Sequence, residues 1–116
     1  MKYLDMSGYT KSFDATTLGS IKEKFPNLTS LNLSNIDLSN RQALHIAELK
    51  NLVELNLSYC LNIHDGTMTK IFKNCRNIES LNLTFCAIVS GECFEHASNT
   101  LIDLKIDQCD NVTKLL

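Results

Sequence analysis

One apolar motif recurs five times along this chain of 116 residues, and it limits the possible folds more than any other feature. Its clearest copy is Leu52-x-x-Leu55-x-Leu57-x-x-Cys60, and the other copies begin at Met1, Leu28, Ile78 and Leu101. The central leucines are residues 4, 31, 55, 81 and 104, so successive copies are 23 to 27 residues apart. A period of this length is typical of proteins in which similar structural units stack side by side.

Each copy of the motif predicts a short β-strand. Successive side chains of a strand point to opposite faces, so the outer residues of Leu-x-Leu should enter the core while the residue between them faces away from it. The five central leucines should then lie one above another in a single apolar ladder. We predict parallel strands, each paired with the strand of the next repeat, near residues 3–7, 30–34, 54–58, 80–84 and 103–107.

The segments between the motifs predict the return path of the chain. Apolar side chains recur at helical spacing, which predicts helices over residues 15–25, 40–49 and 67–75 and a shorter one over 91–97. The expected N-caps of the first three are Asp14, then Ser39 or Asn40, then Asp65. Each helix would lay an apolar stripe on the strand layer, which one repeat alone could not bury.

An asparagine stands directly before the first apolar position of three motifs. These residues are Asn27, Asn51 and Asn77, and Thr100 takes the place in the last copy. Asparagine tolerates the left-handed backbone conformation, so we expect that conformation in these helix-to-strand joints.

The stretch Leu55-Asn56-Leu57-Ser58-Tyr59-Cys60-Leu61-Asn62-Ile63-His64-Asp65-Gly66 resembles the cysteine-containing class of leucine-rich repeat that is familiar from F-box proteins, and Cys75 matches a cysteine at the end of the helix in that class. The resemblance covers nearly the whole chain. It implies an α/β fold: a right-handed leucine-rich-repeat solenoid, an open horseshoe with short parallel strands on the concave face and helices on the convex face. Tyr9 and Ile36 stand where the class has cysteine, and Cys86-Ala87-Ile88 matches Cys60-Leu61-Asn62-Ile63 with one residue fewer.

We expect one domain over residues 1–116, made of about five repeats. The chain starts and stops beside a strand motif, and neither end carries the polar capping unit that stacked repeats need for solubility. The expectation is a fragment of a longer array. The alternative is a structural segment that self-associates through its uncapped edges.

Composition and motifs argue against several classes of function. The net charge is −2 and no block of like charges occurs, so nucleic acid is not an expected partner. No apolar run approaches the roughly 20 residues of a membrane span, and no secretory signal is visible. Nothing resembles a nucleophile, metal or phosphate motif, so we expect no enzyme, no cofactor and no metal.

The cysteines favour a reducing, cytoplasmic or otherwise intracellular location. Their number is odd and no Cys-x-x-Cys pair occurs, which is unlike a disulfide framework. Cys60, Cys86 and Cys109 should stand in a row as small buried side chains rather than converge on a metal. An extracellular receptor fragment is the alternative, because Asn-x-Ser/Thr sequons begin at Asn27, Asn32, Asn56, Asn82 and Asn111.

Side chains on the open side of the strands have no core role and are candidates for binding. Tyr59 and Phe85 occupy equivalent positions in neighbouring repeats, so they should be adjacent and could anchor a protein partner. The alternatives are aromatic rings packed on the loops and an ordinary solvated sheet face. The other candidate protein-binding residues are Glu54, Asn56, Asn82, Asp103 and Lys105, with Tyr3 near the open edge.

These observations predict a non-catalytic interaction module that binds a protein or peptide on its concave face. In F-box proteins such repeats hold the substrate of a ubiquitin ligase, although no F-box is visible in this sequence. Substrate recognition in that pathway, or a pathogen effector that mimics it in a host cell, is the most concrete form of the hypothesis.

Overall fold

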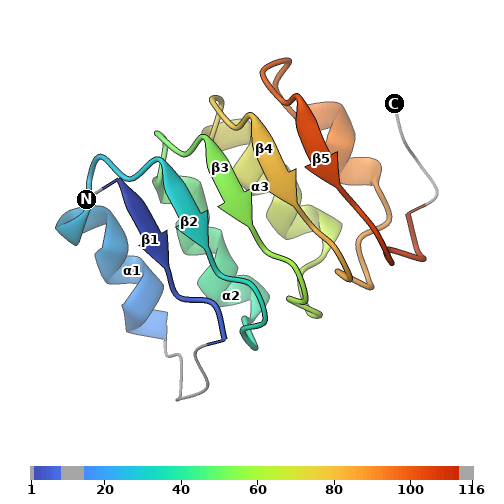
Figure 1. Cartoon of the computed structure of the whole chain (residues 1–116), viewed down its shortest axis with the longest axis horizontal. Coiled ribbons are helices and arrows are strands. Elements are labelled where there is room, and N and C mark those ends of the chain that lie inside the picture. Colours follow the sequence, from blue (N-terminus) through green and yellow to red (C-terminus); the bar gives the residue numbers. More distant parts are fainter. Residues whose placement is uncertain (1, 9–14, 113–116) are drawn as a thin grey trace.

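The computed structural model describes residues 2–8 and 15–112, in which short strands alternate with helical segments (Figure 1). The elements follow the order strand, helix, strand throughout. They are β1 (Tyr3–Asp5), α1 (Ala15–Lys24), β2 (Ser30–Asn32), α2 (Asn40–Ala43), the 3-10 helix η1 (Leu44–Glu48), β3 (Glu54–Asn56), α3 (Asp65–Asn74), β4 (Ser80–Asn82), the 3-10 helix η2 (Glu92–His96) and β5 (Asp103–Lys105).

The strands form one parallel sheet in the order β1-β2-β3-β4-β5. The central leucines pair in register across the whole sheet, which confirms the predicted ladder from Leu4 to Leu104. Each strand is only three residues long, but the backbone pairing continues past its end. Leu33 N donates to Asn56 O at 2.9 Å, and Leu57 N repeats this bond to Asn82 O at 2.8 Å.

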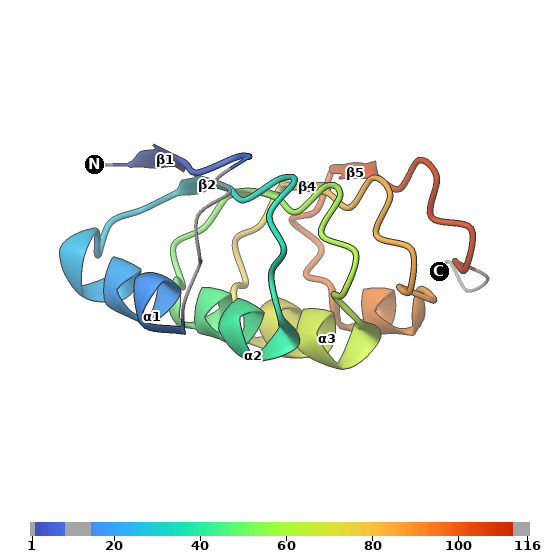
Figure 2. The same cartoon turned by 90° about the horizontal axis from the view of Figure 1, so that it is seen from below.

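All helices lie on one face of the sheet and leave the other face open (Figure 2). The core fills the space between the two layers. Leu31, Leu55 and Leu81 are buried there, whereas Leu4 and Leu104 at the two edges are half-buried. The fold is therefore α/β, with a five-stranded parallel sheet covered on one side.

The helical segments differ from the prediction in a way that follows the repeat length. The segment predicted as one helix over 40–49 continues as a 3-10 helix after Ala43, and the segment over 91–97 forms only the 3-10 helix η2. These two segments belong to the shortest repeats, of 24 and 23 residues. A 3-10 helix rises about 2.0 Å per residue against about 1.5 Å for an α-helix, so it spans the sheet with fewer residues.

The helix caps agree with the prediction in one place and contradict it in another. Ser39 caps α2 in a capping box with Gln42, as predicted. The predicted cap Asp65 is wrong, because His64 caps α3 and its Nδ1 accepts from Thr67 N at 3.3 Å. Asp14 lies outside the described residues, as do Met1 and Tyr9 of the first motif.

Asp65 instead bonds to the next repeat. Its carboxylate accepts from the backbone N–H groups of Ser90, Gly91 and Cys93 at 2.7, 3.1 and 3.0 Å, around the start of η2. Burial tends to raise the pKa of Asp65, but the backbone hydrogen bonds from Ser90 and Cys93 outweigh it and hold the pKa below its ordinary value.

The prediction of left-handed backbone at Asn27, Asn51 and Asn77 is also wrong. Positive φ angles occur at the strand exits, at the equivalent positions Gly8, Asn35, Tyr59, Phe85 and Gln108. Two of the four joint residues, Asn51 and Thr100, bond to the preceding repeat. Asn51 Nδ2 donates to Pro26 O at 3.4 Å, and Thr100 Oγ1 donates to Ile78 O at 2.9 Å.

We predict that Asp65→Asn destabilises the chain at neutral pH but not in acid. A lowered pKa in the folded state stabilises the fold above the unfolded-state pKa, and this contribution is lost as the pH falls through the folded-state value. Urea unfolding at neutral pH should show that the free energy of unfolding falls by about 1 kcal/mol. This figure is kept small because the carboxylate is partly exposed to solvent. At about pH 2.5 the free energies of unfolding of the variant and of wild type should become more similar.

The matched control is Asp110→Asn, which neutralises an exposed carboxylate and should leave stability unchanged at both pH values. An Asp65→Asn loss that is equally large in acid would show that the ionised carboxylate is not the stabilising form.

Candidate functional site

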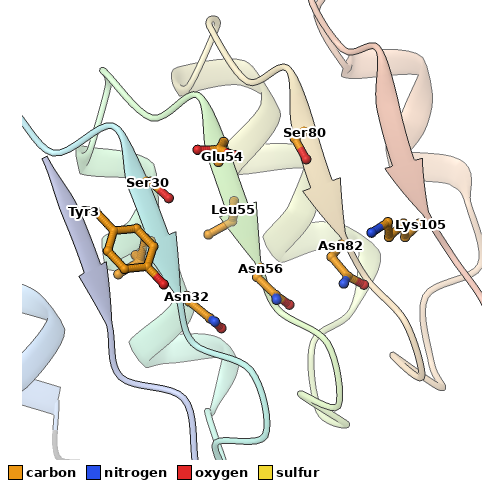
Figure 3. Close-up of a pocket in the computed structure, with 10 residues that line it drawn as sticks. Tyr3, Ser30, Asn32, Glu54, Leu55, Asn56, Ser80, Asn82 and Lys105 are labelled. Carbon is orange, nitrogen blue, oxygen red and sulfur yellow. The ribbon is translucent and has the colours of Figure 1, made fainter.

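The open face of the sheet carries two rows of side chains (Figure 3). Strand register places Tyr3, Ser30, Glu54, Ser80 and Asp103 in one row, as predicted. The second row is Asp5, Asn32, Asn56, Asn82 and Lys105. A shallow hollow of about 200 Å³ lies over both rows, and its lining includes five of the predicted binding residues, Tyr3, Glu54, Asn56, Asn82 and Lys105.

Asp103 is the predicted strand residue that does not line this hollow. Its Oδ2 accepts from Ser80 Oγ at 3.4 Å across the β4–β5 pair. Asp103 therefore lies at the margin of the candidate binding surface and is engaged with its neighbour.

The asparagines of the second row have a structural task. Asn32, Asn56 and Asn82 each accept, through Oδ1, the backbone N–H two residues further on, at 3.0, 3.0 and 2.9 Å. Asp5 does the same for Ser7 at 2.8 Å. These are Asx turns, which end the first four strands. The sequence interpretation missed this role, although the repeated Asn-x-Ser/Thr spacing was a usable signal for it.

Tyr59 and Phe85 are adjacent, as predicted. Their ring centroids are 5.4 Å apart and the ring planes differ by 12°, so the rings stack. They do not pack away against the loops, because Tyr59 is 50% exposed and Phe85 is 40% exposed. The loops that follow β3 and β4 also carry exposed Leu61 and Ile88. We call these four residues the aromatic edge.

The exposure of Ile88 corrects the repeat alignment. The buried equivalent of Ile63 is Val89, since Val89 N donates to Cys86 O just as Ile63 N donates to Cys60 O. The two loops therefore have equal length here, and the predicted one-residue shortening is wrong. The sequence comparison matched Ile88 to Ile63 because both are isoleucines. In the structure the residue that enters the core is Val89.

Both aromatic residues of the stack have an unfavourable backbone conformation. Tyr59 has φ 63° and Phe85 has φ 62°, in the left-handed region that bulky residues rarely occupy. Their N–H groups bond to the next repeat, at 2.8 Å to Thr84 O and at 2.8 Å to Asp107 O. The repeat geometry thus imposes the turn whatever the residue is, and the rings themselves are not needed to make it.

The cysteine row is structural, as predicted. Cys60, Cys86 and Cys109 are buried, and each thiol donates to a backbone carbonyl of the preceding repeat, at 3.2, 3.1 and 2.9 Å. Cys75 and Cys93 are also buried, and none of the five is paired in a disulfide. Burial raises the pKa of Cys60 and Cys75 to about 11 and that of Cys86 to about 12. These values keep the thiols protonated and able to donate at neutral pH.

We predict that the thiols of the folded chain resist modification. The thiolate is the reactive form, and both burial and the raised pKa suppress it. Ellman's reagent at about pH 8 should react slowly with the native chain and rapidly with all five cysteines in concentrated guanidinium. Lys73→Cys, which adds an exposed thiol on α3, is the control and should react at once. Fewer than five reactive thiols in unfolded protein from its natural source would reveal a disulfide.

Within residues 2–8 and 15–112, no group of three or more His, Cys, Asp or Glu side chains could hold a metal ion. In the same part of the chain, no helix combines the length and the apolar character needed to cross a bilayer. A scan against protein-family models found none that matches this chain.

Proposed function

We propose that the chain is a right-handed leucine-rich-repeat solenoid and that its open, concave sheet face binds a protein or peptide without catalysis. The repeat assignment is supported by the period of 23 to 27 residues, by the in-register leucines and by the sequential order of the strands. The observation that carries the binding proposal is the exposed Tyr59–Phe85 stack on left-handed backbone.

The stack is costly for the free chain and useful for a complex. Glycine and asparagine at the equivalent positions 8 and 35 form the same turn with less strain. A bulky residue in the left-handed region costs on the order of 1–3 kcal/mol, and such strain is concentrated at functional sites. Two half-exposed aromatic rings also offer a rigid apolar area, which is what binding hot spots use. Partner binding accounts for both features.

The adjacent hollow defines the partner further. Glu54 and Lys105 bring opposite charges to one lining that is otherwise rich in serine and asparagine. Tyr59 follows Asn56 of the hollow by three residues, so a partner that covers the aromatic edge can reach the hollow along β3. An extended peptide or a loop with an apolar anchor and polar flanks fits this surface better than a compact small molecule does, because the hollow is shallow.

The pathway is a further proposal, and it depends on the resemblance of residues 55–66 to repeats of F-box proteins. Recognition of a ubiquitin-ligase substrate, or mimicry of that recognition by a pathogen effector, would use the same face inside a cell. The unpaired cysteines support a reducing compartment. An extracellular receptor fragment fits less well, since glycans at Asn56 and Asn82 would cover the hollow.

We predict that Tyr59→Asn combined with Phe85→Asn weakens partner binding while the fold persists. Peptides selected from a random phage-displayed library against the wild-type chain should lose at least about tenfold in affinity for the double variant. The lost ring stacking and the relief of left-handed strain act on the free energy of unfolding in opposite directions, so the double variant should still unfold in one cooperative transition.

Ile102→Asn is the matched control, because it removes an even more exposed apolar side chain, 82% accessible, away from the aromatic edge. Selected peptides should bind it as they bind wild type. Equal affinity of the peptides for the double variant and for wild type would refute the anchor role.

Self-association through the edges of the sheet is the second candidate, and the exposed Ile102 next to β5 favours it. Edge strands present unpaired backbone groups that can pair with another copy. We expect this candidate to fail, with the chain sedimenting as a monomer at all concentrations. A sedimentation coefficient that rises with concentration, and that Ile102→Asn returns to the monomer value, would support stacking instead.

A further inference from the structure

Four basic side chains lie on the helix side of the molecule, opposite the proposed binding face. They come from separate parts of the chain: Lys22 on α1, Arg41 on α2, Lys50 after η1 and Lys70 on α3. Figure 2 shows these helices next to one another on the side away from the sheet. Within the part of the chain that the structure describes, none of the four side chains makes an ion pair or a hydrogen bond.

The four side chains line one hollow of about 590 Å³. We call it the helix-side groove. A second cavity of about 290 Å³ shares Lys22, Glu48 and Lys50 with it and continues to Pro26 and Asn51. The volume of the helix-side groove, about 590 Å³, is within the range of roughly 300–1,000 Å³ for ligand sites.

The charge of the groove contrasts with that of the whole chain. The chain carries a net charge of −2, yet Glu48 is the only carboxylate among the described residues that line the groove. Glu48 is already engaged, since its Oε2 lies 3.3 Å from Nδ1 of His45. Like charges held together repel one another, and an anionic partner would remove this repulsion.

An apolar residue lies among these charges. Leu44, the first residue of η1, also lines the groove and is 40% exposed, with buried Ala47 one turn further on. The lining thus offers one contact for an aliphatic side chain, surrounded by cations. No Phe, Tyr or Trp is among the described residues that line it, so it lacks the stacking platform that single-stranded nucleic acids use.

We propose that the helix-side groove binds an acidic protein segment, which places carboxylates beside Lys22, Arg41, Lys50 and Lys70 and one aliphatic side chain on Leu44. This is a second interaction surface and does not depend on the function of the aromatic edge. A membrane surface is a poorer fit, because Leu44 is the only large apolar side chain exposed in the groove, within the described residues.

The test uses the whole chain and a short fluorescein-labelled peptide of glutamates with one central leucine. Anisotropy should show binding that weakens as salt is added. Lys22→Glu combined with Lys70→Glu should reduce the affinity at least about tenfold. The matched control is Lys24→Glu combined with Lys73→Glu, which reverses the same number of charges on the same two helices outside the groove and should bind the peptide at nearly wild-type affinity.

Further outcomes can overturn the proposal. A peptide with glutamine in place of glutamate should not bind, and replacing the central leucine by serine should weaken binding. Equal losses in the two charge-reversal variants would mean that only net charge matters. The same assay is run with oligo-deoxythymidine and with vesicles of phosphatidylcholine and phosphatidylserine in equal parts. If either binds more tightly than the peptide, and loses affinity in the Lys22→Glu, Lys70→Glu variant, the groove belongs to another class of partner. The Tyr59→Asn, Phe85→Asn variant should bind the acidic peptide normally, which separates this surface from the other.

Discussion

Lateral backbone hydrogen bonds between successive repeats determine the register of every side chain in this molecule. They join strand to strand and continue past the strand ends, where Asn35 N donates to Ser58 O and Tyr59 N donates to Thr84 O, both at 2.8 Å. A slip of one residue would turn the leucines outward and the asparagines into the core. The apolar ladder on one face and the two polar rows on the other are therefore two results of the same pairing.

Polar side chains reinforce this pairing by bonding to the neighbouring repeat rather than to their own. The thiols of the cysteine row donate to carbonyls of the repeat before them, and Asp65 accepts from the repeat after it. Asn40 makes three such bonds to the next repeat: its Nδ2 donates to Asn62 O at 2.6 Å, and its Oδ1 accepts from His64 N at 3.1 Å and from Thr67 Oγ1 at 2.6 Å. Each repeat thus satisfies buried polar groups that its neighbour cannot satisfy alone.

The sequence pattern predicted what depends on periodicity and missed what depends on local geometry. Leucine spacing was enough for the strands, their order and the adjacency of Tyr59 and Phe85. The left-handed turns were not predicted, because only Gly8 and Asn35 are residue types that favour this conformation. Aromatic residues occupy two of the equivalent positions. Asp65 was predicted to be a helix cap because its place in the sequence fits one. Its actual hydrogen-bond partners lie about 25 residues further along the chain, and the local sequence does not show them. The helix-side groove could not be predicted, since its cations come from segments whose mutual positions only the packing of the helices determines.

The turn at the strand exits has a wider consequence. The backbone adopts the same left-handed conformation there whichever side chain is present, since glycine, asparagine, tyrosine, phenylalanine and glutamine all have a positive φ. Since the side chain neither enters the core nor makes the turn, it can change during evolution while the register stays intact. One row of positions, running across the sheet at the spacing of the strands, can therefore change its surface by substitution alone, without insertion or rearrangement of the chain.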